Sequence, residues 1–145
     1  MSTGTLAVHI LIFGWWRGGR GWAKLAGMTQ VKQIIGAFGE CMATRYLIAQ
    51  GMVLLERNWR TAAGEIDLIL RDRRDLVFCE VKTRRSLRFG VPVEAMVPAK
   101  VRRMRRLAAQ WLAVAGVRPR EVRFDVLSVL RLNDRVRVEH LRGAF

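Results

Sequence analysis

The sequence is poor in acidic residues, cysteine and histidine. Its 145 residues include 12 aspartates and glutamates against 26 lysines and arginines, a formal charge of +14. Cys41 and Cys79 lie far apart without a Cys-x-x-Cys motif, so we expect no disulfide and no cysteine zinc site. We expect both to be reduced core residues of a cytoplasmic protein. His9 and His140 are isolated, which argues against a histidine zinc site.

The sequence also lacks an apolar run long enough to span a bilayer. The apolar stretch 6–16 is too short for a transmembrane helix. No basic residues precede it and no clear cleavage site follows it, so a signal peptide is not expected either. Because residues 1–27 differ in composition from the rest, we predict an N-terminal extension, disordered or arising from an upstream start. A single domain of residues 28–145 would follow, and it keeps a charge of +11.

The large positive charge points to a polyanionic partner. Hydrophobic residues make up 51% of the chain, which is typical of a folded domain rather than a disordered one. Most of the basic residues are arginines, whose planar guanidinium suits phosphate. Nucleic acid is therefore the first expected partner, and an acidic membrane surface is the second.

Hydrophobic periodicity predicts seven elements in residues 28–145. Helical spacing of apolar residues covers 31–50 and 98–115, and strand-like runs cover the remainder. The order predicts an α/β fold in which helices flank a mixed β-sheet. The expected elements, in the order α-β-β-β-α-β-β, are 31–50, 52–59, 64–70, 76–82, 98–115, 121–130 and 135–141, with a charged turn at 71–75.

The expected hairpin 64–82 carries the most unusual chemistry. Because side chains alternate between the two faces of a strand, Glu65 and Asp67 share one face, and Glu80 and Lys82 share one face. Ile66 is expected on the opposite face, with the strand's other apolar residues. Carboxylates brought together in this way repel each other unless a cation intervenes, and hard oxygen ligands suit Mg²⁺ or Mn²⁺. The alternative is that these charges are only the solvated face of the strands.

Two further carboxylates fall inside expected elements. Glu40 lies beside a strip of small residues, Gly36, Gly39 and Ala43, that permits close backbone approach. It is either a solvated helical glutamate or a carboxylate aimed at the charged face of the hairpin, and the sequence leaves both open. Asp125 lies within the strand 121–130, where an aspartate is more often a structural hydrogen-bond acceptor than a ligand.

Basic residues cluster in two places next to this hairpin. A loop of residues 83–90 leaves the strand of Glu80 and Lys82 directly. The helix 98–115 carries four arginines that have no acidic partner at i+4, so they gain nothing from one another. They are either a solvated face or a surface for phosphates. The residues expected to bind nucleic acid are Arg84, Arg85, Arg88, Lys100, Arg102, Arg103 and Arg106.

Several motifs in order resemble the YraN-like family of small bacterial proteins. They are Gly36-Ala-Phe-Gly-Glu40, Leu55-Glu-Arg-Asn-Trp-Arg60, Gly64-Glu-Ile-Asp-Leu-Ile69 and Val77-Phe-Cys-Glu-Val-Lys-Thr-Arg84, within a match of about residues 30–130. That family in turn resembles the PD-(D/E)xK nuclease superfamily, which includes archaeal Holliday-junction resolvases. The proline that precedes the first aspartate of the motif is replaced here by Ile66.

The resemblance implies a restriction-endonuclease-like fold and a set of catalytic residues. Asp67 and Glu80 would hold Mg²⁺ or Mn²⁺, Lys82 would be the lysine of the motif, and Glu40 the carboxylate of the first helix. The activity would be metal-dependent hydrolysis of phosphodiesters, of DNA more than RNA and of branched DNA in particular, in repair or recombination. A homodimer would be expected, with Trp59 or Trp111 available for its interface.

Two other classes of function stay open at this point. The first is a nucleic-acid-binding module that keeps the nuclease fold but does not cut. The second is a structural or partner-binding protein whose basicity serves association with ribosomes or membranes.

Overall fold

The computed structural model describes residues 8–11, 28–85 and 97–145, and every structural statement below concerns those residues. Two helices and six strands are present. In chain order they are β1 (Val8–Leu11), α1 (Met28–Ala49), β2 (Val53–Thr61), β3 (Gly64–Asp72), β4 (Asp75–Arg84), α2 (Pro98–Ala115), β5 (Val122–Leu132) and β6 (Arg135–Leu141).

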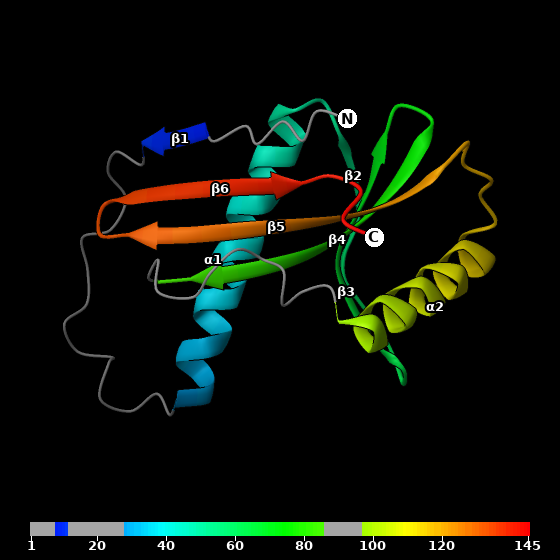
Figure 1. The fold of residues 1–145 in the computed structure, drawn as a ribbon, viewed down its shortest axis with the longest axis horizontal. Coiled ribbons are helices and arrows are strands. Elements are labelled where there is room, and N and C mark those ends of the chain that lie inside the picture. The colour runs from blue at the N-terminus through cyan, green and yellow to red at the C-terminus, as the bar shows by residue number, and fades with distance from the viewer. Residues whose placement is uncertain (1–7, 12–27, 86–96) are drawn as a thin grey trace.

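The strands form one mixed sheet in the order β1-β6-β5-β4-β3-β2 (Figure 1). Only β4 and β5 are parallel among the described pairs, and the chain between them includes α2. The α/β class, the mixed sheet and the predicted order from α1 to β6 are confirmed. The segment expected to be an extension contains β1, which pairs with the edge of β6. The rest of that segment lies outside the described residues, and the domain boundary at residue 28 stays a prediction.

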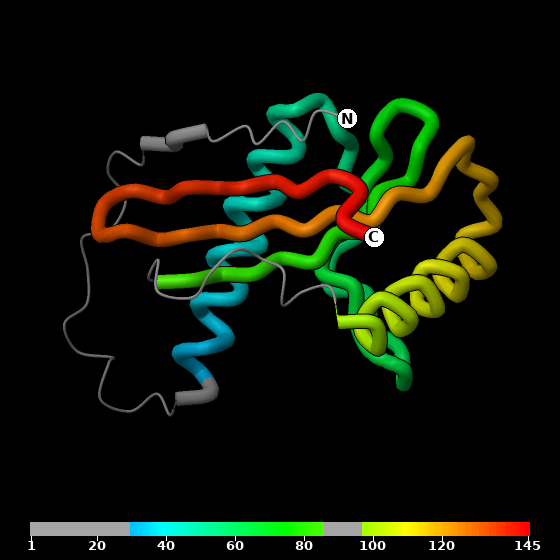
Figure 2. The backbone as a smooth tube through the Cα atoms, viewed as in Figure 1, coloured from blue at the N-terminus to red at the C-terminus, as the bar shows by residue number. Residues whose placement is uncertain are grey.

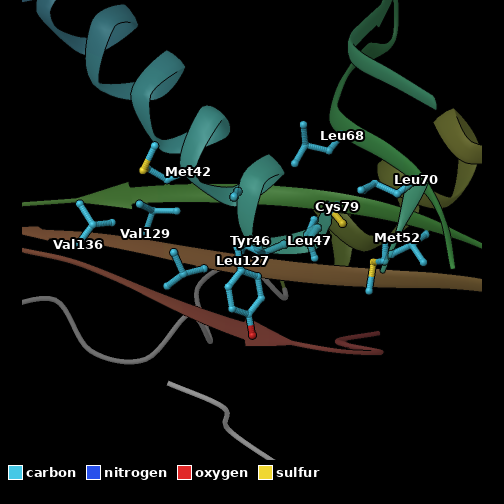
Figure 3. Packing of buried hydrophobic residues seen from close by; sticks show 13 residues of the cluster. Met42, Tyr46, Leu47, Met52, Leu68, Leu70, Cys79, Leu127, Val129 and Val136 are labelled. Carbon is cyan, nitrogen blue, oxygen red and sulfur yellow. The ribbon is translucent and has the colours of Figure 1, made fainter. Parts of the chain in front are cut away.

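Helix α1 packs on one face of the sheet (Figures 1 and 3). Its buried residues Met42, Ala43, Tyr46 and Leu47 meet apolar side chains of β3, β4, β5 and β6. Cys79 lies in this cluster, and both cysteines are free, as the sequence predicted. The periodic apolar face of α1 therefore forms one half of the hydrophobic core.

Helix α2 covers the opposite face with its own apolar stripe. Met104, Leu107, Ala108 and Trp111 pack against a second cluster that includes Phe78 of β4. Pro98 begins the helix at a position where its missing N–H costs nothing. Gly116 ends it in the left-handed conformation, with φ of 63°, and donates its N–H to Leu112. The sheet is thus a central layer between two helices.

The turns are tighter than the sequence suggested. The expected loop 71–75 contracts to Arg73 and Arg74, because β3 and β4 extend into it until Asp72 faces Asp75. Arg73 adopts a positive φ of 59° to close the turn. The two facing carboxylates are neutralised from β5 and the segment before it. Arg123 lies 3.1 Å from Asp72, and Arg120 lies 2.9 Å from Asp75.

Two expectations about side-chain position are wrong. Ile66 does not share the face of Leu68 but packs into the cluster under α2, so strict alternation fails near the start of β3. Trp111 is not an exposed interface residue: it is 7% exposed, and its indole N–H donates to Glu56 at 2.7 Å. Trp59 is partly buried against the same cluster. Packing between α2 and the sheet accounts for the placement of all three residues.

Asp125 ties the C-terminus to the sheet. The chain turns after β6 and returns onto β5 (Figure 2). The fully buried carboxylate of Asp125 accepts hydrogen bonds from Arg123 and from the Gly143 N–H, and it lies 2.7 Å from His140 Nε2. Burial alone would raise the pKa of Asp125, but these hydrogen bonds outweigh burial and lower it. The predicted role as a structural acceptor is confirmed.

Neither α1 nor α2 is long and apolar enough to cross a membrane, and these are the helices within the described ranges.

Candidate active site

The candidate site lies where β3 and β4 separate. Their antiparallel pairing runs from Asp72 opposite Asp75 to Leu68 opposite Cys79 and then stops. Asp67 and Glu80 occupy the next two facing positions. Beyond this point β4 continues beside β5 as far as Arg84, whereas β3 and β2 run in another direction (Figure 1). The site is therefore an opening between two strands rather than part of a continuous ladder.

Where the β3–β4 ladder ends, the side-chain carboxylate of Asp67 accepts a hydrogen bond from the backbone of β4. Asp67 Oδ2 accepts the backbone N–H of Val81 at 2.7 Å. Burial raises the pKa of Asp67 to about 7, and the negative charge of nearby Glu80 contributes to the same shift. The hydrogen bond from the Val81 N–H opposes this rise in pKa, and the charges of Glu40 and Glu65 add smaller contributions to it. The predicted crowding of carboxylates on the hairpin is therefore present around Asp67.

Glu80 has the opposite electrostatic surroundings. Its Oε1 atom lies 2.7 Å from Lys82 Nζ and 2.5 Å from Lys100 Nζ. Burial alone would raise the pKa of Glu80, but the hydrogen bonds and charges of the two lysines outweigh it and lower the pKa. Burial would lower the pKa of Lys82, yet Glu80 raises it, so Lys82 is protonated at neutral pH as its carboxylate neighbours predict.

Glu40 reaches the region of Asp67 from α1. Its carboxylate accepts a hydrogen bond from the side-chain amide of Asn58 on β2, at 2.8 Å. Close packing of α1 on the sheet makes this possible, because a Cβ atom on Gly39 would lie only 1.7 Å from Thr83 Oγ1. Of the two interpretations left open by the sequence, the geometry favours a carboxylate near the charged face of the hairpin.

The donor set fits a divalent cation held by two carboxylates. In the part of the chain that the structure describes, no three or more Asp, Glu, His or Cys side chains form a ready-made metal cluster. Mg²⁺, however, is commonly bound through one or two carboxylates and completes its octahedral shell with water and substrate phosphate. Asp67 and Glu80 supply such a pair, and a cation would relieve the repulsion that raises the pKa of Asp67.

The residues expected to bind nucleic acid fall into different surroundings. Arg102, Arg103 and Arg106 are exposed on α2, and none forms an ion pair with an acidic side chain within the described ranges. Arg85 is exposed, Arg84 is partly buried at the end of β4, and Arg88 lies outside the described residues. Lys100 points into the candidate site instead of lying on the open surface. Their nucleic-acid contacts stay predictions.

The sequence missed two partners of the site. Lys100 was placed with the exposed cations of its helix, and Asn58 was not singled out at all. A basic residue in the first turn of α2 was the only available signal for Lys100, since the packing of α2 over β4 decides where that side chain goes. Asn58 adopts a left-handed conformation with φ of 51°, which asparagine tolerates better than most residues, but one asparagine in a strand predicts no contact.

The fold and the site together define a small α/β protein with carboxylates and lysines gathered where two strands of a mixed sheet part. Its sequence belongs to the family described as "Uncharacterised protein family UPF0102", which it matches over residues 39–129. That range includes Glu40, Asp67, Glu80, Lys82 and Lys100.

Individual relatives match most of the chain. A UPF0102 protein of Frankia alni is 56% identical over 117 residues, which cover 80% of this chain and 98% of the relative. A UPF0102 protein of Nocardioides sp. is 54% identical over 114 residues, covering 78% and 92% respectively. The similarity extends to a UPF0102 protein of Acidothermus cellulolyticus, 43% identical over 132 residues, covering 83% of this chain and all of the relative.

Proposed function

We propose that this protein is a metal-dependent endonuclease that hydrolyses phosphodiester bonds. The observation that carries the proposal is that Asp67 and Glu80 occupy the two positions that follow the last β3–β4 pair, Leu68 opposite Cys79, and that Lys82 lies 2.7 Å from Glu80. Two carboxylates can hold a divalent cation and a lysine can stabilise charge on a phosphate, which suits metal-assisted hydrolysis of a phosphodiester. The resemblance of the sequence motifs to the PD-(D/E)xK superfamily supports the same reaction.

The charges of the site suit an anionic substrate. A divalent cation, when bound, would neutralise a phosphate oxygen and lower the pKa of a water molecule. Asp67 and Glu80 would hold that cation, and Glu40 would add negative charge beside it. Lys82, being protonated, would stabilise the charge that develops on the phosphorus oxygens rather than act as a general base.

The basic surface next to the site would hold the substrate backbone. Arg102, Arg103 and Arg106 are exposed on the helix whose first turn contributes Lys100 to the site. The net charge of +14 favours a long polyanion over a single phosphate. We extend the proposal to DNA in preference to RNA, to branched DNA in repair or recombination, to a cytoplasmic location and to a homodimer.

The second candidate is a nucleic-acid-binding module that does not cut. Two observations favour it. Glu80 is already neutralised by two ammonium groups, and within the described ranges no cluster of three metal-binding side chains exists. Such a module would use the same basic surface and would not depend on a divalent cation.

A cleavage assay on branched, flapped, single-stranded and duplex substrates, with Mg²⁺ or Mn²⁺ against EDTA, separates the two candidates. We expect metal-dependent cleavage of at least one substrate by the wild type and none by Lys82→Ala. Asp67→Asn should lose Mn²⁺ binding in calorimetry while remaining folded, because the asparagine oxygen can still accept the Val81 N–H. Binding without cleavage across the whole panel would instead establish the non-cutting module.

A further inference from the structure

Two ammonium groups compete for one oxygen atom in the candidate site. Lys82 and Lys100 both contact Oε1 of Glu80, at 2.7 and 2.5 Å. Lys100 is the more buried of the two lysines, with 19% of its side chain exposed against 41% for Lys82. Glu80 itself is 13% exposed. The positive charge of the site is therefore concentrated on Glu80, and Lys100 is the lysine that is better shielded from solvent.

This distribution of charge is uneven between the two facing carboxylates. Among the described residues, Asp67 forms no ion pair with a lysine or arginine and accepts a hydrogen bond only from the N–H of Val81. Glu80, in contrast, has two positive partners. Each carboxylate oxygen offers two lone pairs, so two ammonium groups occupy the usual directions of approach to Oε1. A cation that bridges Asp67 and Glu80 through this oxygen must displace one of the lysines.

The two lysines differ in how they are held. Lys82 lies on β4, whose backbone at this position pairs with Ser128 of β5, and its Cα is only two residues from that of Glu80. Lys100 comes from another element and reaches Glu80 from the first turn of α2. Both lysines have the same flexible stem, but Lys82 stays beside Glu80 on one strand whichever rotamer it adopts, so Lys100 is the partner that can move away from the site.

We propose that Lys100 is the counter-ion of Glu80 in the metal-free protein and that a divalent cation displaces it on binding. Lys100 is then a positioning residue that competes with the metal for Glu80. The inference rests on the proposed metal-dependent function, because it concerns how the same site is loaded.

Calorimetric titration of the full chain with Mn²⁺ tests this competition. Lys100→Met keeps the apolar stem of the lysine but removes its charge, so it should bind Mn²⁺ about tenfold more tightly than the wild type, as expected from losing one partly buried like charge. Lys100→Arg keeps the competing charge and should not bind more tightly than the wild type. Arg118→Met is the matched control, because it removes one exposed charge that lies beyond the C-terminal end of α2, and Ala115 at that end is about 22 Å along the helix from Lys100, more than a Debye length.

Thermal denaturation of each variant establishes that it is folded, and Lys100→Gln replaces Lys100→Met if the latter is not. An affinity of Lys100→Met no tighter than that of Arg118→Met overturns the inference. If the wild type still cleaves its substrate although Lys100→Met binds Mn²⁺ no more tightly, the proposed function stands and only the inference about Lys100 is lost. If the wild type neither binds Mn²⁺ nor cleaves any substrate, the proposed function fails and the inference fails with it.

Discussion

At the scale of single residues, Asp67 and Glu80 show how one pair of strands gives two carboxylates opposite electrostatic properties. The pKa of Asp67 is raised to about 7 and that of Glu80 is lowered. Both side chains are largely buried, so burial acts on both in the same direction. The difference comes from their partners, since two lysines contact Glu80, whereas the negative charges of other carboxylates help to raise the pKa of Asp67.

The raised pKa of Asp67 predicts that the metal-free protein loses stability as pH rises from about 4 to 7. In this interval the folded state still binds a proton that the unfolded state, with a pKa of 3.8, has released. The loss should approach a few kcal/mol, at most roughly 4 for a shift of about three units, and should persist above pH 7. Urea denaturation in EDTA at pH 5 and pH 8 measures the larger part of this loss.

The substitution Asp67→Asn should remove most of this pH dependence and raise the stability at pH 8. Glu65→Gln is the matched control, because Glu65 lies two residues away but is half exposed and paired with Arg60. Equal pH dependence in the wild type and in Asp67→Asn would contradict the assignment of the shift to Asp67.

The sequence predicts those site residues whose side-chain direction follows from alternation along a strand. Asp67, Glu80 and Lys82 follow from the hairpin, whose register brings the two carboxylates to facing positions. Alternation failed at Ile66, where β3 departs from β4 and the side chain turns toward α2. Lys100 and Asn58 join the site only through the packing of separate elements, which no local pattern specifies.

At the scale of elements, the approach of α1 to β4 depends on one glycine. A Cβ on Gly39 would meet Thr83 Oγ1 at 1.7 Å and Thr83 Cβ at 2.9 Å, so either Thr83 or the helix would have to move. We expect Gly39→Ala to lower the free energy of unfolding by about 1–3 kcal/mol, as overpacked cores do. Chemical denaturation checks this.

Gly36 provides the control within the same helix. A Cβ there meets nothing within 4 Å, so Gly36→Ala should stabilise the protein by up to about 1 kcal/mol through helix propensity. A destabilisation of similar size at both glycines would show that helix geometry, not the contact with Thr83, is responsible.

Substitutions on the exposed face of helix α2 should weaken nucleic-acid binding without affecting catalysis. Replacing Arg102, Arg103 and Arg106 together should weaken binding to all nucleic-acid sequences, because the lost contacts are to phosphates. The slope of log K against log salt on duplex DNA should fall by roughly 2 to 3 if all three arginines touch phosphates. Salt titrations of binding measure this slope, and cleavage at saturating substrate should persist.

Lys82→Ala is the reciprocal control. It should abolish cleavage and leave the affinity nearly unchanged, since one charge in a small site contributes little to a footprint spread over many phosphates. An unchanged salt slope in the triple variant would remove α2 from the nucleic-acid surface.

At the scale of the whole molecule, β1 adds a sixth strand to a sheet whose other strands follow α1. It pairs through four residues with β6 at the edge of the sheet. We expect a chain that begins at Met28 to fold and to lose no more than about 2 kcal/mol, because a few edge hydrogen bonds contribute about 1 kcal/mol or less each. A large fall in melting temperature on this truncation would show that residues 1–27 fill part of the core.

The parallel pair β4–β5 also affects the order in which the parts of the chain fold. Facing residues such as Leu76 and Val122 are separated by much of the second half of the chain, whereas the meander β2–β4 and the hairpin β5–β6 form from near neighbours. Because of the loop closure over that distance, we expect the joining of β4 to β5 to be the slow event of folding. During synthesis the apolar edge of β4 stays unpaired until β5 has left the ribosome, so the nascent chain carries an aggregation-prone edge at the centre of its future sheet.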